Sequence, residues 1–369
     1  MIHVLLVFTL SLFVLSQVLA RDNQPKYYEI KASSHYHLGY QFGSNTKTLV
    51  QKRFAEDEIL NKKLVPFYNT EKGKEIFNHF YTNNRFPDYM DEIRGIAAGA
   101  QVPFELVFMS TLNEEFSDYV DEKYRYKPVE TCSDIIINEG PYHGICHNED
   151  GSLLDFDRTA LLDVSLTLPS GVTLFTAWCY VGQLPTAAFG FNRNIAFTMN
   201  YLHTAKGDFD GIARNFIARY LLDATSLDDA WERIRSTPHC VGHNYQIMDL
   251  TNGYTVDIEV APFDRIGYFV ALPGHPHFHS NMYSLLQVDD TPSASSIHRE
   301  ARYKQLTPPS SFDDALNILS DTADREEPIY RNTTLNTVVF DYYRNIYVIY
   351  SGVPSMKNVY IERVLHWKS

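Results

Sequence analysis

One cysteine stands where the sequence changes from helical to strand-like patterns. Cys132 follows the charged stretch 118–130, DYVDEKYRYKPVE, and precedes the β-branched run at 135–137. A thiol has a reference pKa of about 8.5, and only the thiolate is a strong nucleophile. Nucleophilic chemistry at this position therefore needs a base, and no histidine lies within four residues of Cys132 in the chain.

Cleavage of the Thr131–Cys132 bond would supply that base. A free α-amino group titrates near about 7.7–8.0, so its neutral form is present at neutral pH. Nucleophile and base would then belong to one residue, and we expect the precursor to cut itself there. The alternative is that Cys132 is a buried structural thiol or half of a disulfide. The other cysteines are Cys146, Cys179 and Cys240.

The histidines do not predict a metal site. His143 and His147 are four residues apart in an expected strand, where about 13 Å separates them, too far to chelate one ion. Two further groups are His239, Cys240 and His243, and the Pro-broken loop with His275, His277 and His279. No phosphate-cradling glycine loop is present. We therefore expect neither a metal ion nor a cofactor.

Several segments resemble the N-terminal nucleophile (Ntn) hydrolases. Residues 131–134 (TCSD), a predicted hairpin and residues 143–150 (HGICHNED) are similar to the start of the catalytic chain in that superfamily. More narrowly, they resemble the acyl-CoA:6-aminopenicillanate acyltransferase family, which includes an insect N-β-alanyl-dopamine hydrolase. Further similar segments keep the family's order along the chain: 86–104, 190–200, 278–287, 299–306 and 331–341. That shared order carries the resemblance, since each segment alone is a weak signal.

The resemblance implies a role for each matching residue. Cys132 matches the nucleophile and new N-terminus, and Asp150 matches a carboxylate that orients the α-ammonium. Asn281 matches the amide that faces the developing oxyanion, where one donor lowers the barrier by ~2.7–4 kcal/mol. Arg331 matches an arginine that holds a carboxylate or supports the oxyanion. Asn200 ends a strand where the family often has a polar group, and is a candidate for substrate binding.

Each of these residues has a structural alternative. The alternatives are a turn residue for Asp150, a backbone-bonding loop residue for Asn281, and a surface ion pair with Glu326 or Glu327 for Arg331.

Three positions depart from the family pattern or conflict with it. Thr131 stands where the family often has Gly, which eases a strained peptide. Ala261 stands where the penicillin acyltransferases have Ser, which argues against penicillin chemistry. Asn332 begins the N-glycosylation sequon Asn-Thr-Thr beside Arg331, and a glycan there is expected to crowd the site. Glycosylation of Asn332 and an active-site Arg331 are therefore expected to exclude each other.

Two kinds of periodicity set the fold class. Residues 30–118 show helical spacing, clearest at Met90, Ile93 and Ile96. After residue 131 the expected strands are 135–137, 142–146, 161–168, 172–179, 186–190, 195–200, 244–250, 254–260, 266–271, 335–341 and 345–350. Helices are expected around Phe216 and Trp231 and at 296–306 and 312–320. This order fits two antiparallel sheets between helices, and the resemblance implies an α+β, four-layer αββα Ntn sandwich.

Composition bounds the class of protein and its location. The chain has 369 residues, 44% of them apolar, and a formal net charge of -13 without a dense basic run, so disorder and nucleic-acid binding are excluded. Residues 1–20 read as a secretory signal peptide, with a membrane anchor as the alternative. We expect a helical region at 21–131 and a catalytic region at 132–369.

Together these patterns predict a secreted or lysosomal, self-processing cysteine amidase or acyltransferase without a transmembrane anchor. Its expected partners are a small N-acyl or N-aminoacyl amine and the two fragments of its own precursor, which stay together. Amide hydrolysis is favoured over transfer because acyl-CoA is an intracellular thioester. Two alternatives remain: an inactive secreted binding or structural protein with the Thr131–Cys132 bond intact, and a lysosomal lipid-amide hydrolase of related fold.

Overall fold

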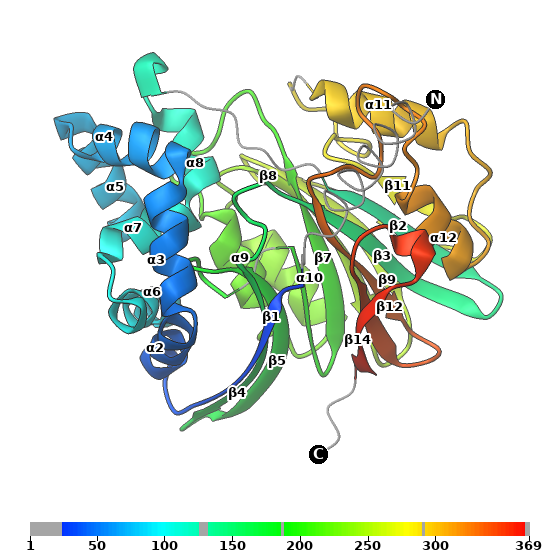
Figure 1. Ribbon diagram of the computed structural model, residues 1–369, viewed down its shortest axis with the longest axis horizontal. Helices are drawn as coiled ribbons and strands as arrows, with labels where there is room; N and C mark the ends of the chain where they lie inside the picture. Colours follow the sequence, from blue (N-terminus) through cyan, green and yellow to red (C-terminus); the bar gives the residue numbers. More distant parts are fainter. Residues whose placement is uncertain (1–23, 125–131, 186–187, 290–291, 366–369) are drawn as a thin grey trace, which may run out of the picture.

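The computed structural model describes residues 24–124, 132–185, 188–289 and 292–365, and it consists of two β-sheets between helices (Figure 1). The signal peptide expected at 1–20 and residue Thr131 lie outside the described residues. Among the residues described, no helix combines the length and the apolar character needed to cross a membrane.

The N-terminal part forms a block of packed helices, as its periodicity predicts. Its elements are α2 (His35–Asn45), α3 (Lys47–Glu56), the π-helix η1 (Leu60–Leu64), α4 (Val65–Tyr68), α5 (Glu71–Asn83), α6 (Pro87–Ala100), α7 (Phe104–Thr111), α8 (Asn113–Tyr119) and the 3-10 turn η2 (Glu122–Tyr124). Ser34 caps α2 and Thr70 caps α5, each by accepting a backbone N–H of the first turn. Pro87 begins α6, where its missing N–H costs no hydrogen bond.

The larger sheet has eight strands in the order β1-β4-β5-β6-β7-β8-β9-β10. Their bounds are β1 (Lys26–Ala32), β4 (Thr159–Leu168), β5 (Gly171–Tyr180), β6 (Phe189–Asn192), β7 (Ile195–Leu202), β8 (Gly242–Asp249), β9 (Thr255–Ala261) and β10 (Arg265–Val270). Helices α9 (Arg214–Leu221) and α10 (Leu227–Ser236) follow β7 in the chain. The strands pair antiparallel as expected, with the exception that β1 runs parallel to β4.

The smaller sheet has six strands in the order β11-β2-β3-β12-β13-β14. Their bounds are β2 (Ser133–Glu139), β3 (Tyr142–Asp150), β11 (His277–His279), β12 (Thr334–Asp341), β13 (Ile346–Tyr350) and β14 (Val359–Val364). The helical elements beside it in the chain are α11 (Ala294–Tyr303), α12 (Phe312–Leu319) and the 3-10 turn η3 (Pro354–Met356). Figure 1 shows α11 and α12 on the side of the molecule opposite α2–α8.

Three apolar clusters separate the layers. Along β5, Phe175 and Ala177 belong to the cluster shared with the N-terminal helices, whereas Trp178 belongs to the cluster between the sheets. Along β2, Ile136 faces the other sheet, and Ile135 packs in the cluster that contains residues of α12. This alternation, which has the period of two that a strand requires, confirms the predicted αββα architecture.

The same alternation directs polar side chains into the space between the sheets. Cys132 and Asp134 lie on the Ile136 face of their strand, and His147 and Glu149 lie on the Ile145 face of β3. The register Ser133↔Asn148 brings these two groups to the same end of the strand pair. A polar cluster therefore occupies this end of the layer, and a second one lies between β9 and β11, where His277 bonds to Asp257 and His279 bonds to Glu259.

Helices α2 and α6 approach each other through glycine. A Cβ atom added at Gly39 would lie 1.9 Å from the Glu92 carbonyl oxygen, and one at Gly95 would lie 2.2 Å from the Tyr36 carbonyl oxygen. These contacts are with backbone, which cannot move aside as a side chain can. The two helices are therefore closer than any larger residue permits.

We expect Gly95→Ala to destabilise the protein by ~1–3 kcal/mol, because α2 and α6 must separate to admit the methyl group. Denaturant unfolding followed by circular dichroism measures this. The matched control is Ala98→Ser on the exposed side of α6, expected to change the free energy of unfolding by less than ~0.5 kcal/mol. Equal unfolding midpoints for Gly95→Ala and wild type would contradict the close approach.

Candidate active site

Cys132 is buried directly before β2, and a fully buried arginine holds its backbone. The guanidinium of Arg299, on α11, donates from Nη1 to the carbonyl oxygen of Cys132 and to Ser133 Oγ at 3.0 Å. Its Nη2 donates to Asn281 Oδ1 at 2.9 Å. Burial lowers the pKa of Arg299 to about 10, with Arg331 adding to the effect, yet the group remains a cation at neutral pH. Arg299 thus links the predicted nucleophile to the predicted oxyanion donor.

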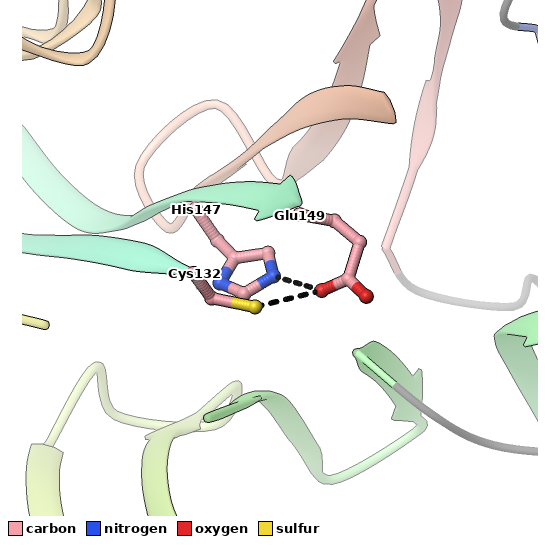
Figure 2. Close-up of side chains that lie close together, drawn as sticks. All are labelled: Cys132, His147 and Glu149. Carbon is pink, nitrogen blue, oxygen red and sulfur yellow. Dashed lines mark hydrogen bonds and ion pairs between the residues drawn. The ribbon is translucent and has the colours of Figure 1, made fainter. Parts of the chain in front are cut away.

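The thiol of Cys132 donates to a buried carboxylate (Figure 2). Its Sγ lies 3.1 Å from Glu149 Oε2, and the same oxygen lies 3.1 Å from His147 Nε2. The hydroxyl of Tyr180, on β5 of the other sheet, donates to Glu149 Oε1. Donors from both sheets therefore fix the orientation of the Glu149 carboxylate beside the sulfur.

His147 lies between two carboxylates. Its Nδ1 is 3.0 Å from Asp134 Oδ1, and its Nε2 bonds to Glu149. Burial lowers the pKa of His147, but Asp134 and Glu149 together outweigh it and raise the pKa to about 10. The ring is therefore an imidazolium at neutral pH with both N–H groups engaged, so it acts as a fixed cation and not as a base.

Asp134 is itself held by the second sheet. Thr198 Oγ1 donates to its Oδ1 at 2.6 Å, and Asn200 Nδ2 donates to its Oδ2. Asn200, the candidate for substrate binding, thus belongs to the network that contains Cys132. Its Oδ1 is buried and has no hydrogen-bond partner among the described residues, so it can accept a donor from a ligand.

Asp150 and Arg331 form a pair on the other face of β3. Because consecutive residues of a strand point to opposite sides, Asp150 points away from the face that carries Glu149. Its Oδ2 lies 3.3 Å from Arg331 Nε, and Thr334 donates to its Oδ1. A register shift in β12 next to Thr334 puts that hydroxyl within reach. Burial raises the pKa of Asp150 to about 6, although Arg331 and Thr334 oppose it.

Asn281 is fully oriented by its neighbours. Its Oδ1 accepts from Arg299, and its Nδ2 donates to the Tyr201 carbonyl oxygen at 3.0 Å. The Nδ2 group carries two hydrogens, of which Tyr201 takes one. The backbone bond is the alternative foreseen from the sequence, but the link through Arg299 also brings Asn281 into the Cys132 site.

One alternative from the sequence is wrong. All four cysteines lie in the described part of the chain, and each is buried and unbridged, so Cys132 is not half of a disulfide. Asn332 is exposed, whereas the Arg331 side chain is only 12% exposed and lies against Asp150. The exclusion between a glycan on Asn332 and an active-site Arg331 stays a prediction. Arg331 also lies 3.6 Å from Glu327, so the ion pair considered for it exists alongside the buried one.

Four residues of the site were not found from the sequence: Asp134, His147, Glu149 and Arg299. His147 was weighed only as a metal ligand with His143, which instead bonds to Thr255. The sequence signal that could have found three of them is the two-residue spacing of a strand face. Cys132 and Asp134 have this spacing, and so do His147 and Glu149. Arg299 is 167 residues from Cys132 and gave no local signal.

The same atoms are arranged so that they could bind a divalent cation. Cys132 Sγ, His147 Nε2 and Glu149 Oε2 all lie within 4.8 Å of one another. Asp134 on Nδ1 resembles the carboxylate that often supports a metal-bound histidine. A metal would have to displace the proton between His147 and Glu149 and the proton on the thiol.

One family model matches more than half of the chain. The model described as "Acyl-coenzyme A:6-aminopenicillanic acid acyl-transferase" matches residues 138–355. That match includes Glu149, Asp150, Asn281, Arg299 and Arg331, and it begins six residues after Cys132.

Two individual relatives were also found. The "Beta-alanyl-dopamine/carcinine hydrolase" of Drosophila melanogaster is 24% identical over 354 residues, covering 87% of this chain and 92% of the relative. Among solved structures, the Caenorhabditis elegans N-acylethanolamine-hydrolyzing acid amidase (NAAA) ortholog aligns with a TM-score of 0.41 and 12% identity, over 57% of this chain and 93% of that one.

We expect His147 to stay protonated well above neutral pH. Its folded pKa of about 10 exceeds the unfolded value of about 6.5, so the imidazolium stabilises the fold fully below pH ~6.5 and this contribution is lost as pH rises through about 10. NMR titration of ¹⁵N-histidine-labelled protein measures the pKa. His143 on the same strand is the control, because burial lowers its pKa below the usual value. A His147 signal that titrates near pH 6.5 would contradict the ion-paired arrangement.

Proposed function

This chain belongs to the acyl-coenzyme A:6-aminopenicillanic acid acyl-transferase family, and from that premise we propose that it is a self-processing cysteine amidase acting on small N-aminoacyl amines. The observation that carries the proposal is the thiol of Cys132, buried directly before β2 and bonded to an oriented carboxylate. A buried structural cysteine has no need of such a partner.

The proposed reaction uses the α-amino group that cleavage before Cys132 releases. The amine takes the thiol proton, and the thiolate attacks the substrate carbonyl to form a tetrahedral oxyanion. The remaining N–H of Asn281, held in place by Arg299, donates to that oxyanion. The ammonium then returns its proton to the leaving amine, and water hydrolyses the thioester on Cys132.

The substrate class is proposed from the curated relative. That relative is named as a hydrolase of β-alanyl-dopamine, in which an aminoacyl group is joined to an amine by an amide bond. Ala261, buried in β9 where penicillin acyltransferases have Ser, supports leaving penicillin chemistry aside.

Hydrolysis is proposed over acyl transfer, together with a secreted or lysosomal location. Both follow from the signal-like sequence of residues 1–20, since acyl-CoA is an intracellular donor. The two fragments are proposed to stay together, because the apolar cluster on the helical side contains residues from both sides of the cut.

We expect purified wild type to show two fragments, the larger beginning at Cys132, and to hydrolyse β-alanyl-dopamine. Cys132→Ala should stay whole and lose at least about 10³-fold of the activity, since it lacks the nucleophile. Intact mass and product release measure these outcomes. The control is Cys146→Ala, a buried thiol on the opposite face of β3, which should be cut and active.

Other results would reject specific parts of the proposal. An uncut wild type that hydrolyses no amide supports an inactive binding protein. Faster hydrolysis of an N-acylethanolamine than of β-alanyl-dopamine supports a lipid-amide hydrolase instead.

We also expect catalysis without a metal ion. Treatment with EDTA followed by desalting should leave hydrolysis within about twofold of the untreated rate. The reason is that the thiol of Cys132 and the ring of His147 both already bond to the Glu149 carboxylate. Loss of activity that added Zn²⁺ restores would show that these side chains hold a catalytic ion.

A further inference from the structure

Self-cleavage needs a base other than the α-amine that the mature enzyme uses. In the uncut chain the nitrogen of Cys132 is an amide, so it cannot serve as the base for its own thiol. A thiol at its reference pKa of about 8.5 is mostly protonated at neutral pH. Another group must therefore accept the thiol proton before the first bond is cut. This question rests on the proposed function, since it arises only if the chain cuts itself.

Glu149 has the position that this role requires. Its Oε2 accepts the Cys132 thiol at 3.1 Å, within the distance of direct proton transfer. The register of the two strands sets this contact. Ser133 pairs with Asn148, so the next positions, Cys132 and Glu149, lie opposite each other on the same face. His147 and Tyr180 bond to the carboxylate and prevent it from rotating away from the sulfur.

The other charged groups nearby are already committed. His147 is an imidazolium whose two N–H groups bond to Asp134 and Glu149, so it has no lone pair to offer. Asp134 accepts from His147, Thr198 and Asn200. Asp150 lies on the opposite strand face with Arg331.

We propose that Glu149 is the general base of self-cleavage. The thiol proton moves to Glu149 Oε2, and the thiolate attacks the carbonyl carbon of residue 131. Collapse of the tetrahedral intermediate breaks the bond between that carbon and the nitrogen of Cys132, and Glu149 gives its proton to this nitrogen. The product is a thioester between residue 131 and Cys132 Sγ. Water then hydrolyses the thioester, which leaves a carboxylate at residue 131 and both a free thiol and a free α-amine at Cys132.

Two cations assist the base without taking part in the proton transfer. The imidazolium of His147 lies close to the sulfur and favours the thiolate over the thiol. The guanidinium of Arg299 holds the Cys132 carbonyl oxygen and so fixes the residue that must attack. Once the α-amine exists, it takes over as the base, and Glu149 is no longer required for proton transfer.

The test separates self-cleavage from hydrolysis in the full-length chain. Glu149→Gln keeps the shape and an acceptor oxygen but removes the basic carboxylate, and should slow the appearance of the 132–369 fragment by about 100-fold or more. Intact mass followed over time measures the rate. Glu149→Asp, which keeps a shortened carboxylate, should be cut at an intermediate rate. Melting temperatures within a few degrees of wild type verify that each variant folds.

A second arm supplies the cut from outside. A protease recognition sequence is placed directly before Cys132, and the added protease exposes the α-amine in both wild type and Glu149→Gln. The matured Glu149→Gln protein should hydrolyse β-alanyl-dopamine at least about 100-fold faster than its uncut form, because the α-amine then supplies the base, but more slowly than matured wild type, because the carboxylate beside the thiol is missing. Cys132→Ala treated in the same way is the negative control and should stay inactive.

The outcomes distinguish failure of this inference from failure of the proposed function. Self-cleavage of Glu149→Gln at the wild-type rate overturns the assignment, and so does a matured variant as inactive as Cys132→Ala. A wild-type chain that never cuts itself rejects the self-processing step, and the role of Glu149 is rejected with it.

Discussion

The structure depends on an ion-paired chain of side chains buried between the two sheets. Asp134, His147 and Glu149 are all removed from water, and each buried ion costs several kcal/mol of lost hydration. That cost is offset only because every charge has an oriented partner, with Thr198, Asn200 and Tyr180 donating from the opposite sheet. The two sheets are thus held in one relative position by polar contacts as well as by apolar packing. These buried charges lower the stability of the fold and fix the orientation of the Cys132 thiol.

Strand alternation explains how such a cluster arises directly beside the apolar cluster between the sheets. Ile136 and Ile145 lead directly into Asp134 and His147 on the same faces, so the apolar cluster becomes the polar site without any change in backbone geometry. The opposite face of β3 carries Asp150, which pairs with Arg331 beside α11 and α12. One strand therefore supplies two separate carboxylates, at consecutive positions, to two different environments.

The sequence identified the residues with local or family-wide signals and missed those that depend on register. The bounds of β4 and β7 were predicted to within a few residues. Buried positions alternate along part of β4 and are continuous along β7. Strands β1 and β14 were missed because they are edge strands with few buried positions. Cys132 and Asn281 were singled out through resemblance, and the structure links them through Arg299.

Glu149 illustrates why the rest could not be predicted. Its position beside Cys132 follows from the register in which two strands pair, and residue spacing in the sequence does not give that register.

The contact between Arg299 and Cys132 has a consequence for when the site becomes active. The ribosome completes Arg299 167 residues after Cys132, which at ~5–20 residues per second is a delay of roughly 10–30 s. Until α11 has emerged and docked, the backbone at Cys132 lacks the guanidinium that fixes it, and Asn281 lacks its orienting partner. The nascent chain therefore carries an unassembled nucleophile while at least the next 167 residues are made, a little under half of the 369. The site can assemble only after α11 has been synthesised.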